Sequence, residues 1–247
     1  MKKKIMDLLV ERDLAEDLEK AKALIMAGQV IVNSNRIDKP GTLVKSDSEV
    51  RIKFKSKFVS RAGEKLFGAI EHCNLQAKVK GASCLDIGAS TGGFTDCLLG
   101  LGAKSVTSVD VGTNQLAWKL RSHPQVESME KTDIRDFASL YKGSGYDFIV
   151  GDVSFISLLS LVDSIFKLSG GKASALLLIK PQFEVPKSSV PDGGVVKDTS
   201  LVDHSLERVK KGFEEKGFAV LDMFPSRVKG TKGNQEYFLF VKVMDNC

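Results

Sequence analysis

The chain has 247 residues, of which 43% are hydrophobic and 27% charged, and its formal net charge is +5. These proportions are typical of a soluble globular protein, and the length allows one large domain or one medium domain with an appendage. The four cysteines form no CxxC pair and have no metal-ligand spacing, and the three histidines are scattered. The composition therefore argues against a metal site or a disulfide framework, and a reducing cytoplasm fits it best.

Two features argue against export and membrane insertion. The basic start at residues 1–4 is followed by Asp7 and Glu11, where a signal peptide would have an uncharged apolar core. The longest uncharged apolar-rich run, residues 153–162, is ten residues long, which is too short to span a bilayer. We therefore expect no stable membrane insertion.

Residues 1–54 have the pattern of a small α+β module. Apolar residues between positions 14 and 25 recur at helical spacing, Asp17 can cap the helix start, and Gly28 can end it. The predicted strands cover residues 29–32 and 50–54, and the predicted turns cover residues 33–36 and 39–41.

A basic stretch begins at the end of this module and runs through a short polar linker at residues 55–60. Residues 51–65 carry six basic side chains against one acid, Glu64. The six are Arg51, Lys53, Lys55, Lys57, Arg61 and Lys65. Such a stripe suits a polyanion such as nucleic acid, and a solvated charged face is the alternative.

Strand and helix patterns alternate over residues 61–247, which we take as a second domain. The predicted strands are 83–87, 105–109, 126–129, 146–150, 173–179, 218–223 and 237–243, and the main predicted helices are 93–101, 114–122, 156–168 and 201–216. This alternation predicts an α/β fold, in which a mostly parallel sheet carries helices on both faces. No helical pattern separates the last two strands, so we expect the seventh strand to run antiparallel.

Residues 84–94 combine an apolar run, an acid, a glycine-rich turn and the start of a helical pattern. Ser90 excludes the dinucleotide-binding fingerprint, and Phe94 stands where a P-loop requires lysine. The remaining pattern resembles motif I of S-adenosylmethionine-dependent methyltransferases. Its residues are Asp86, Gly88, Gly92, Gly93 and Phe94.

Polar side chains also stand where the other predicted parallel strands end. They are Asp110, Asp133, Asp152 and Lys180. Ligands of an open parallel sheet bind outside the carboxyl ends of its strands, so these residues are candidate site residues. Each has a simpler alternative, because an aspartate after a strand often caps the next helix and a lysine there is usually solvated. Glu130 and Asp136 are expected to be surface residues.

Two resemblances cover the chain. Residues 27–33 (AGQVIVN) and 38–41 (DKPG) resemble the S-four-type RNA-binding module. The whole chain resembles the TlyA (haemolysin A) family, which joins such a module to an FtsJ-like ribose methyltransferase domain. The blocks that carry this resemblance are 60–66 (SRAGEKL), 85–95 (LDIGASTGGFT), 115–118 (QLAW), 152–158 (DVSFISL), 180–184 (KPQFE), 193–196 (GGVV) and 236–239 (EYFL).

The resemblance implies a catalytic Lys-Asp-Lys-Glu tetrad. Its members here would be Lys65, Asp152, Lys180 and Glu236. A ribose 2′-hydroxyl is a poor nucleophile until its proton is removed. A neutral lysine can take that proton if its pKa falls from about 10 toward the working pH, which a second ammonium and partial burial favour. We expect Lys180 to be the base, the two carboxylates to orient the amines, and Lys65 to be a second cation.

The resemblance also implies binding residues. The predicted cofactor is S-adenosylmethionine, held by the loop of Asp86, Gly88, Gly92, Gly93 and Phe94, with Asp110 at its ribose, Asp133 at its adenine, and Asp152 nearby. The predicted RNA contacts are Lys20, Lys22, Arg36, Lys39, Lys55, Lys57 and Arg61. S-four-type modules place a Ser-Arg pair at the helix start, where this chain has Asp17 and Leu18. Trp118 is expected in the core.

The implied activity is 2′-O-methylation of ribosomal RNA, either as naked RNA or in assembled subunits, in the cytoplasm and without a metal. Two alternatives belong to other classes. The family name records a membrane-lytic activity, although an amphipathic helix at residues 14–27 is explained by packing within its own module. The second alternative is an RNA-binding protein with an inactive methyltransferase fold, and the four intact tetrad residues argue against it.

Overall fold

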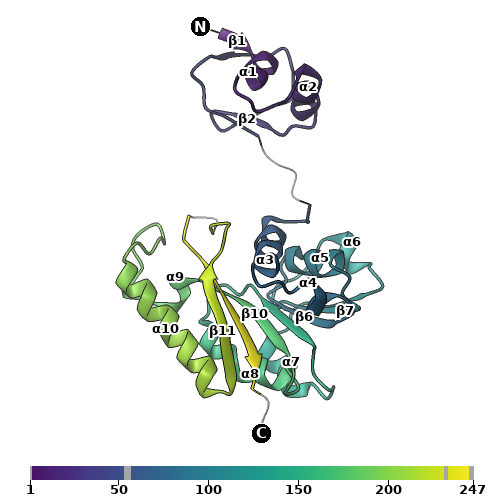
Figure 1. Ribbon diagram of the computed structural model, residues 1–247, viewed down its shortest axis with the longest axis vertical. Coiled ribbons are helices and arrows are strands. Elements are labelled where there is room, and N and C mark those ends of the chain that lie inside the picture. Colours follow the sequence, from purple (N-terminus) through teal and green to yellow (C-terminus); the bar gives the residue numbers. More distant parts are fainter. Residues whose placement is uncertain (1, 53–56, 231–232, 245–247) are drawn as a thin grey trace. The chain divides into compact units, whose positions relative to one another are not determined.

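The computed structural model describes residues 2–52, 57–230 and 233–244. The chain divides into two compact units, Met1–Lys55 and Ser56–Cys247 (Figure 1). Each unit has its own buried apolar core.

The first unit is a small α+β fold. Its elements are β1 (Lys2–Lys4), α1 (Ile5–Glu11), α2 (Leu18–Met26), β2 (Val30–Val32), β3 (Asn35–Ile37), β4 (Leu43–Lys45) and β5 (Val50–Ile52). Strands β3, β2 and β5 form an antiparallel sheet, β1 pairs with β4, and α1 packs with α2 on a core that includes Ile5, Leu9 and Ile25.

The predicted cap of α2 is confirmed, because the Asp17 carboxylate accepts a hydrogen bond of 2.7 Å from the Lys20 backbone N–H. Three expectations need correction. Helix α1 was not predicted from the sequence. The amphipathic helix expected at residues 14–27 begins only at Leu18, directly after its cap. The predicted turn 33–36 shortens to Asn33 and Ser34, because Asn35 already pairs in β3. Residues 53 and 54 of the predicted last strand lie outside the described residues.

The second unit is an α/β fold with a seven-stranded sheet. Its strands are β6 (Ser83–Ile87), β7 (Ser105–Val109), β8 (Val126–Met129), β9 (Phe148–Gly151), β10 (Ser174–Ile179), β11 (Phe218–Pro225) and β12 (Tyr237–Val243). Its helices are α3 (Arg61–His72), α4 (Gln76–Val79), α5 (Gly93–Gly100), α6 (Trp118–Arg121), α7 (Ile134–Leu140), η1 (Leu158–Leu161), α8 (Val162–Leu168), α9 (Pro181–Glu184), η2 (Lys187–Ser189) and α10 (Thr199–Glu215).

The strand order is β11-β12-β10-β9-β6-β7-β8. All neighbouring pairs from β10 to β8 are parallel, and β12 runs antiparallel to both β10 and β11. The predicted fold class is therefore confirmed, including the antiparallel seventh strand. The chain turns to opposite sides of β6 when it builds β7 and β9, so the crevice between β6 and β9 is the topological switch point at which such sheets bind ligands.

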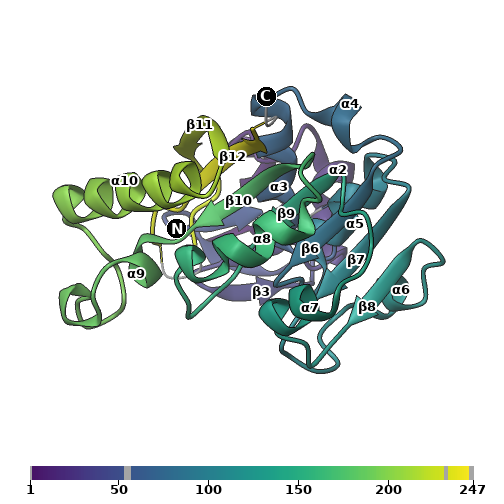
Figure 2. The same cartoon turned by 90° about the horizontal axis from the view of Figure 1, so that it is seen from below.

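Apolar side chains fill both faces of this sheet. One face carries α7, α8 and α10, and its core includes Leu85, Ile149 and Leu177. The other face carries α3 and α5, and its core includes Phe94 and Phe148 (Figure 2). Strand β10 is buried along its whole length, as expected of a strand covered on both faces.

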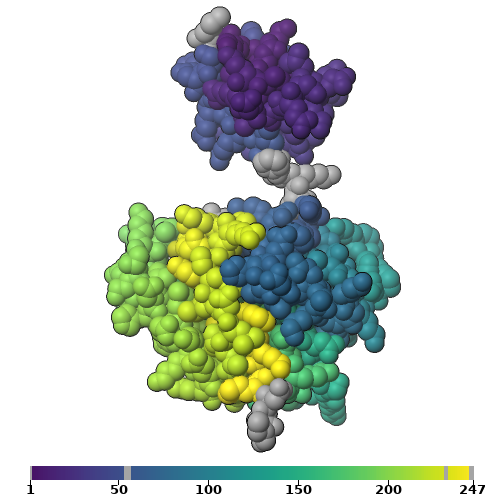
Figure 3. Space-filling model, viewed as in Figure 1, coloured from purple at the N-terminus to yellow at the C-terminus, as the bar shows by residue number. Residues whose placement is uncertain are grey.

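Two segments far apart in the sequence meet on the second face. The blue surface around α3 lies beside the yellow surface of β11 and β12 in Figure 3, and Leu66 shares a core with Phe238. The predicted helices 114–122 and 156–168 are only partly formed, since the first shortens to α6 and the second begins as the 3-10 turn η1.

Candidate active site

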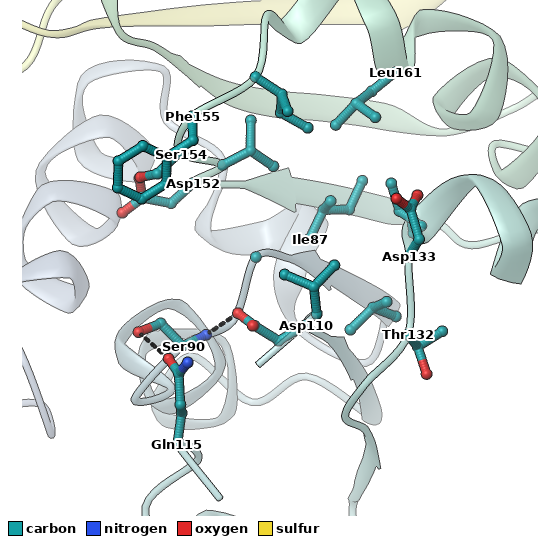
Figure 4. A pocket seen from close by; sticks show the side chains of 16 residues that line it. Ile87, Ser90, Asp110, Gln115, Thr132, Asp133, Asp152, Ser154, Phe155 and Leu161 are labelled. Atoms are coloured by element: carbon teal, nitrogen blue, oxygen red, sulfur yellow. Dashed lines mark hydrogen bonds between the residues drawn. The ribbon is translucent and has the colours of Figure 1, made fainter. Parts of the chain in front are cut away.

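A cavity of about 310 Å³ lies at the carboxyl ends of the central strands (Figure 4). Its lining includes Gly88, Ser90, Asp110, Gln115, Thr132, Asp133, Asp152, Ser154 and Phe155. Gly88 directly follows β6 and has a φ of +78°, and a Cβ built there would lie 2.9 Å from the Asp152 carbonyl oxygen. A side chain at position 88 would therefore collide with the backbone that follows β9, so glycine is needed for the close approach of the two loops.

Asp110 joins the loops on two sides of this cavity. Its carboxylate accepts hydrogen bonds from the Ser90 backbone N–H at 2.7 Å and from the Gly112 backbone N–H at 2.6 Å. The Ser90 hydroxyl in turn donates to Gln115 Oε1 at 3.1 Å (Figure 4). A carboxylate has about four acceptor positions, so Asp110 keeps capacity to accept hydrogen bonds from a ligand.

Asp133 lines the same cavity and also caps α7. Its carboxylate accepts a hydrogen bond of 2.8 Å from the Arg135 backbone N–H and forms an ion pair of 2.5 Å with the Arg135 guanidinium. These contacts lower the pKa of Asp133, so the carboxylate is ionised at neutral pH. The simpler reading as a helix cap is thus correct for Asp133, and the same residue faces the cavity.

A second cavity, of about 280 Å³, brings all four predicted tetrad residues together. It shares Gly88, Ser90, Asp152 and Ser154 with the first cavity. Lys180 Nζ lies 2.6 Å from Asp152 Oδ1, and Lys65 Nζ lies 2.5 Å from Glu236 Oε2. The cavity therefore holds two lysine amino groups, each paired with one carboxylate, next to the first cavity.

The order of the strands explains this convergence. Asp152 follows β9 and Lys180 follows β10, so both stand at the carboxyl edge of the parallel sheet. Glu236 precedes β12, and because β12 is antiparallel, its amino end reaches the same edge. Lys65 comes from the second turn of α3, which packs on that face.

Residues 58–243 match the model of the FtsJ-like methyltransferases. The chain belongs to this family. The resemblance of the second unit to FtsJ-like methyltransferases is thereby confirmed, and so is the cofactor class, S-adenosylmethionine, which supplies an activated methyl group. The first cavity suits this cofactor, because Gly88 leaves room for close approach and Asp110 retains acceptor capacity toward hydroxyl groups.

The similarity to known proteins extends over nearly the whole chain. The "16S/23S rRNA (cytidine-2'-O)-methyltransferase TlyA" of Mycobacterium tuberculosis is 39% identical over 95% of this chain and 87% of its own length. "Hemolysin A" of Brachyspira hyodysenteriae is 40% identical over 90% of this chain and 92% of its own length. A solved structure, "Putative hemolysin from Streptococcus thermophilus", has a TM-score of 0.75 at 38% identity and covers 99% of this chain and 90% of its own.

Three predicted cofactor residues of this methyltransferase do not line either cavity. Asp86 is fully buried and accepts a hydrogen bond of 2.6 Å from the Thr95 hydroxyl, and desolvation raises its pKa to about 7. Gly92 caps α5 with a φ of +92°. Gly93 packs against α3, where a Cβ would lie 2.8 Å from the Gly63 nitrogen. Their roles in the structure are to form and pack the loop rather than to line the ligand space.

Phe94 lines the second cavity and not the first. It is almost completely buried, and its ring lies 6.4 Å from that of Phe238. The structure therefore places Phe94 as a wall of the tetrad cavity.

Sequence reasoning missed two residues beside Lys180 and Asp152. Ser154 accepts a hydrogen bond of 2.7 Å from Lys180 Nζ, so Lys180 is oriented by a hydroxyl as well as by a carboxylate. Phe155 is 88% exposed on the rim of the first cavity and has a φ of +69°. Both stand within three residues of Asp152 at the end of a parallel strand, and this position could have marked them as site residues.

Glu130 is not the plain surface residue that we expected. Its carboxylate accepts hydrogen bonds from the backbone N–H groups of Asn114 and Gln115, at 3.0 and 3.1 Å, and pairs with Arg121 at 2.8 Å. These contacts hold the pKa of Glu130 below its usual value. Glu130 thus organises the loop that contributes Gln115 to the cofactor cavity, and no local pattern pointed to this role.

The expectation that Trp118 belongs to the core is wrong, because its side chain is 76% exposed on the short helix α6. Helix α6 is only four residues long, so the amphipathic pattern from which the prediction came is not realised as one continuous helix.

The predicted RNA contacts fall into three groups. Lys20, Lys22, Arg36 and Lys39 are exposed on the first unit, and Lys55 lies outside the described residues. Lys57 is exposed on the second unit, with its ammonium 5.3 Å from the Phe67 ring. Arg61 lines the tetrad cavity.

In residues 2–52, 57–230 and 233–244, no three His, Cys, Asp or Glu side chains are grouped in a way that would hold a metal ion. Within the same ranges, every helix is too short or too polar to cross a membrane.

Proposed function

We propose that this methyltransferase transfers a methyl group from S-adenosylmethionine to the 2′-oxygen of a ribose in ribosomal RNA. The observation that carries the proposal is that the two cavities share part of their walls. One holds the residues suited to the cofactor, the other holds two ion-paired lysines, and they share Gly88, Ser90, Asp152 and Ser154. A relative over most of the chain is named as an rRNA (cytidine-2'-O)-methyltransferase, which supports ribosomal RNA as the substrate class.

Lys180 is the proposed base. The neutral amine of Lys180 would take the proton of a 2′-hydroxyl bound in the tetrad cavity as the oxygen bonds to the methyl carbon. The bond from that carbon to the cofactor sulfur would break in the same step, and S-adenosylhomocysteine would leave. Asp152 and Ser154 hold the amine in place at 2.6 and 2.7 Å, so its direction is set before the hydroxyl arrives.

Lys65 and Glu236 form the proposed second pair. Both side chains are nearly buried, at 11% and 4% exposure, so their charges act in a region of low solvent content. The Lys65 ammonium would favour negative charge on the reacting oxygen, and Glu236 keeps the ammonium at the cavity wall.

The proposed cofactor contacts use the first cavity. Asp110 would accept hydrogen bonds from the ribose hydroxyls of the cofactor, and Asp133 would accept one from the adenine amino group. Gly88 allows the backbone to approach, and Asp152 borders both cavities. Asp86, Gly92 and Gly93 do not line this cavity and would stabilise the loop that does.

RNA would be held by basic residues of both units. Lys20, Lys22, Arg36 and Lys39 on the first unit, with Lys55, Lys57 and Arg61, are the proposed phosphate contacts. The exposed ring of Phe155, on the rim of the first cavity, offers a surface on which an unstacked base can lie. Ribosomal RNA as substrate also implies action in the cytoplasm.

The test is methyl transfer from radiolabelled S-adenosylmethionine to ribosomal subunits and to naked ribosomal RNA, with Lys180→Ala as the control. Label at one alkali-resistant position would establish 2′-O-methylation and identify the nucleotide. Label that enters a base, or protein, would contradict the proposal. Failure to label either RNA, with intact cofactor binding, would favour a different substrate or the membrane activity implied by the name of the Brachyspira relative.

A further inference from the structure

The four-residue helix α9 contacts the segment 152–158 at three successive points. Lys180, which precedes α9, contacts Asp152 and Ser154 at 2.6 and 2.7 Å. The Phe183 ring lies 5.3 Å from the ring of Phe155. Glu184 then accepts two hydrogen bonds from the far end of the segment. The segment that lines both cavities is therefore attached along its length to one short helix.

Glu184 makes the last of these attachments from a buried position. Its side chain is 4% exposed, and its two carboxylate oxygens accept from the Ser157 hydroxyl at 2.6 Å and from the Leu158 backbone N–H at 2.7 Å. Arg208 on α10 donates to the Glu184 carbonyl oxygen, and its guanidinium lies 3.8 Å from the carboxylate. Because Glu184 lines neither cavity, it does not touch a ligand there.

The backbone of Phe155 shows why the segment needs such attachment. Its φ of +69° is a left-handed conformation, which is strained for a residue other than glycine. A strained residue of this kind persists only where the flanking structure holds it. Here Lys180 holds the chain on one side of Phe155, and Glu184 holds it on the other.

We propose that Glu184 is a positioning residue for methyl transfer. By holding Ser157 and Leu158, it fixes the segment in which Asp152 and Ser154 orient Lys180. This inference rests on the proposed role of Lys180 as the base. The competing explanation is purely structural, since an acid at the start of η1 also stabilises a helix N-terminus.

The two explanations differ in what a substitution changes. Glu184→Ala removes both acceptors, Ser157→Ala removes one donor, and Glu184→Gln keeps an oxygen for Leu158 and an amide for Ser157. Glu214→Ala, on the exposed side of α10, is the matched control. For each variant, kcat, the Kd of S-adenosylmethionine, Tm and the hydrogen exchange of the amides of residues 152–158 are measured.

We expect Glu184→Ala to lower kcat about tenfold or more, because a catalytic amine that is even slightly misplaced reacts much more slowly. The cofactor Kd should change much less, since Asp110 and Asp133 are untouched. Exchange in 152–158 should accelerate. Ser157→Ala should show the same pattern more weakly, and Glu184→Gln should recover most of kcat.

A lowered Tm with unchanged kcat and exchange in Glu184→Ala would leave only the structural explanation and overturn the proposal. An equal loss of kcat in Glu184→Gln would do the same, because the hydrogen-bonding geometry would then be irrelevant. If Glu184→Ala does not fold, Ser157→Ala decides. If the unmodified protein binds cofactor but methylates no RNA, the proposed function fails, and the exchange data still decide whether Glu184 holds the segment.

Discussion

Lys65 and Glu236 form an ion pair of 2.5 Å although 171 residues separate them in the chain. The contact joins the second turn of α3 to the residue before β12. Removing two charges from water is costly, and a buried pair of this kind is weak evidence for stability. Its place in the wall of the tetrad cavity instead favours a functional reason for the pair.

Breaking this pair should affect stability as well as activity. Glu236→Leu leaves the Lys65 ammonium buried without its carboxylate, so we expect the free energy of unfolding to fall by about 3–5 kcal/mol. The double variant Lys65→Met/Glu236→Leu should regain most of that loss, because no uncompensated charge remains. Denaturant unfolding measures both effects, and methyl transfer should be lost in both. Equal stability of the single and double variants would contradict the pairing.

Replacing the proposed base should stop the reaction and spare the cofactor. Lys180→Ala is expected to lower kcat by about 10²–10⁴-fold, the usual contribution of a general base. The Kd of S-adenosylmethionine, measured by calorimetry, should hardly change. Lys187→Ala, on an exposed lysine of the following turn, is the control and should behave as the unmodified protein. A large loss of cofactor affinity in Lys180→Ala would assign Lys180 a structural role.

Asp110 is expected to govern cofactor affinity. Asp110→Ala removes the acceptor proposed for the cofactor ribose and also releases the Ser90 and Gly112 backbone N–H groups. The Kd of S-adenosylmethionine should rise about tenfold to a hundredfold, in line with 1.5–3 kcal/mol for a charged hydrogen bond. Asp136→Asn, on an exposed aspartate of α7, serves as the control. An unchanged Kd would refute the assignment.

Asp86 should make stability depend on pH in an unusual direction. Burial raises its pKa from 3.8 to about 7, so ionisation favours the unfolded chain. The contribution of this group is therefore greatest below about pH 4 and is lost as the pH rises to about 7. Asp86→Asn has no group that titrates at this position. The difference in free energy of unfolding, variant minus unmodified protein, should therefore increase between pH 4 and pH 7, by up to the order of 4 kcal/mol. Parallel pH profiles would show that Asp86 titrates normally.

The exposed lysines of the first unit should contribute to RNA binding through phosphate contacts. Lys22→Glu/Lys39→Glu in the full chain should weaken RNA affinity and reduce the slope of log Kd against log salt by about one to two, roughly one per lost contact. The cofactor Kd should stay the same, since neither lysine lines a cavity of the second unit. RNA affinity equal to that of the unmodified protein would remove the first unit from the proposed RNA surface.

Local sequence patterns determined the architecture of the second unit and the position of its site. Strands alternated with helices, and the acids and the lysine that follow β7, β8, β9 and β10 were identifiable because parallel strands bring their carboxyl ends to one edge. The glycine turn after β6 was recognisable because backbone approach requires glycine there. The helix cap at Asp17 was also predictable, because capping depends only on residues that are neighbours in sequence.

Only the tertiary structure decided which side chains act together. Lys65 meets Glu236 because the antiparallel β12 inserts between β10 and β11, an arrangement that depends on the whole sheet. The same holds for Glu184, whose partners lie in another segment. Periodicity and turn chemistry report interactions over a few residues, whereas these contacts arise from strand order and packing, which no short window of the sequence contains.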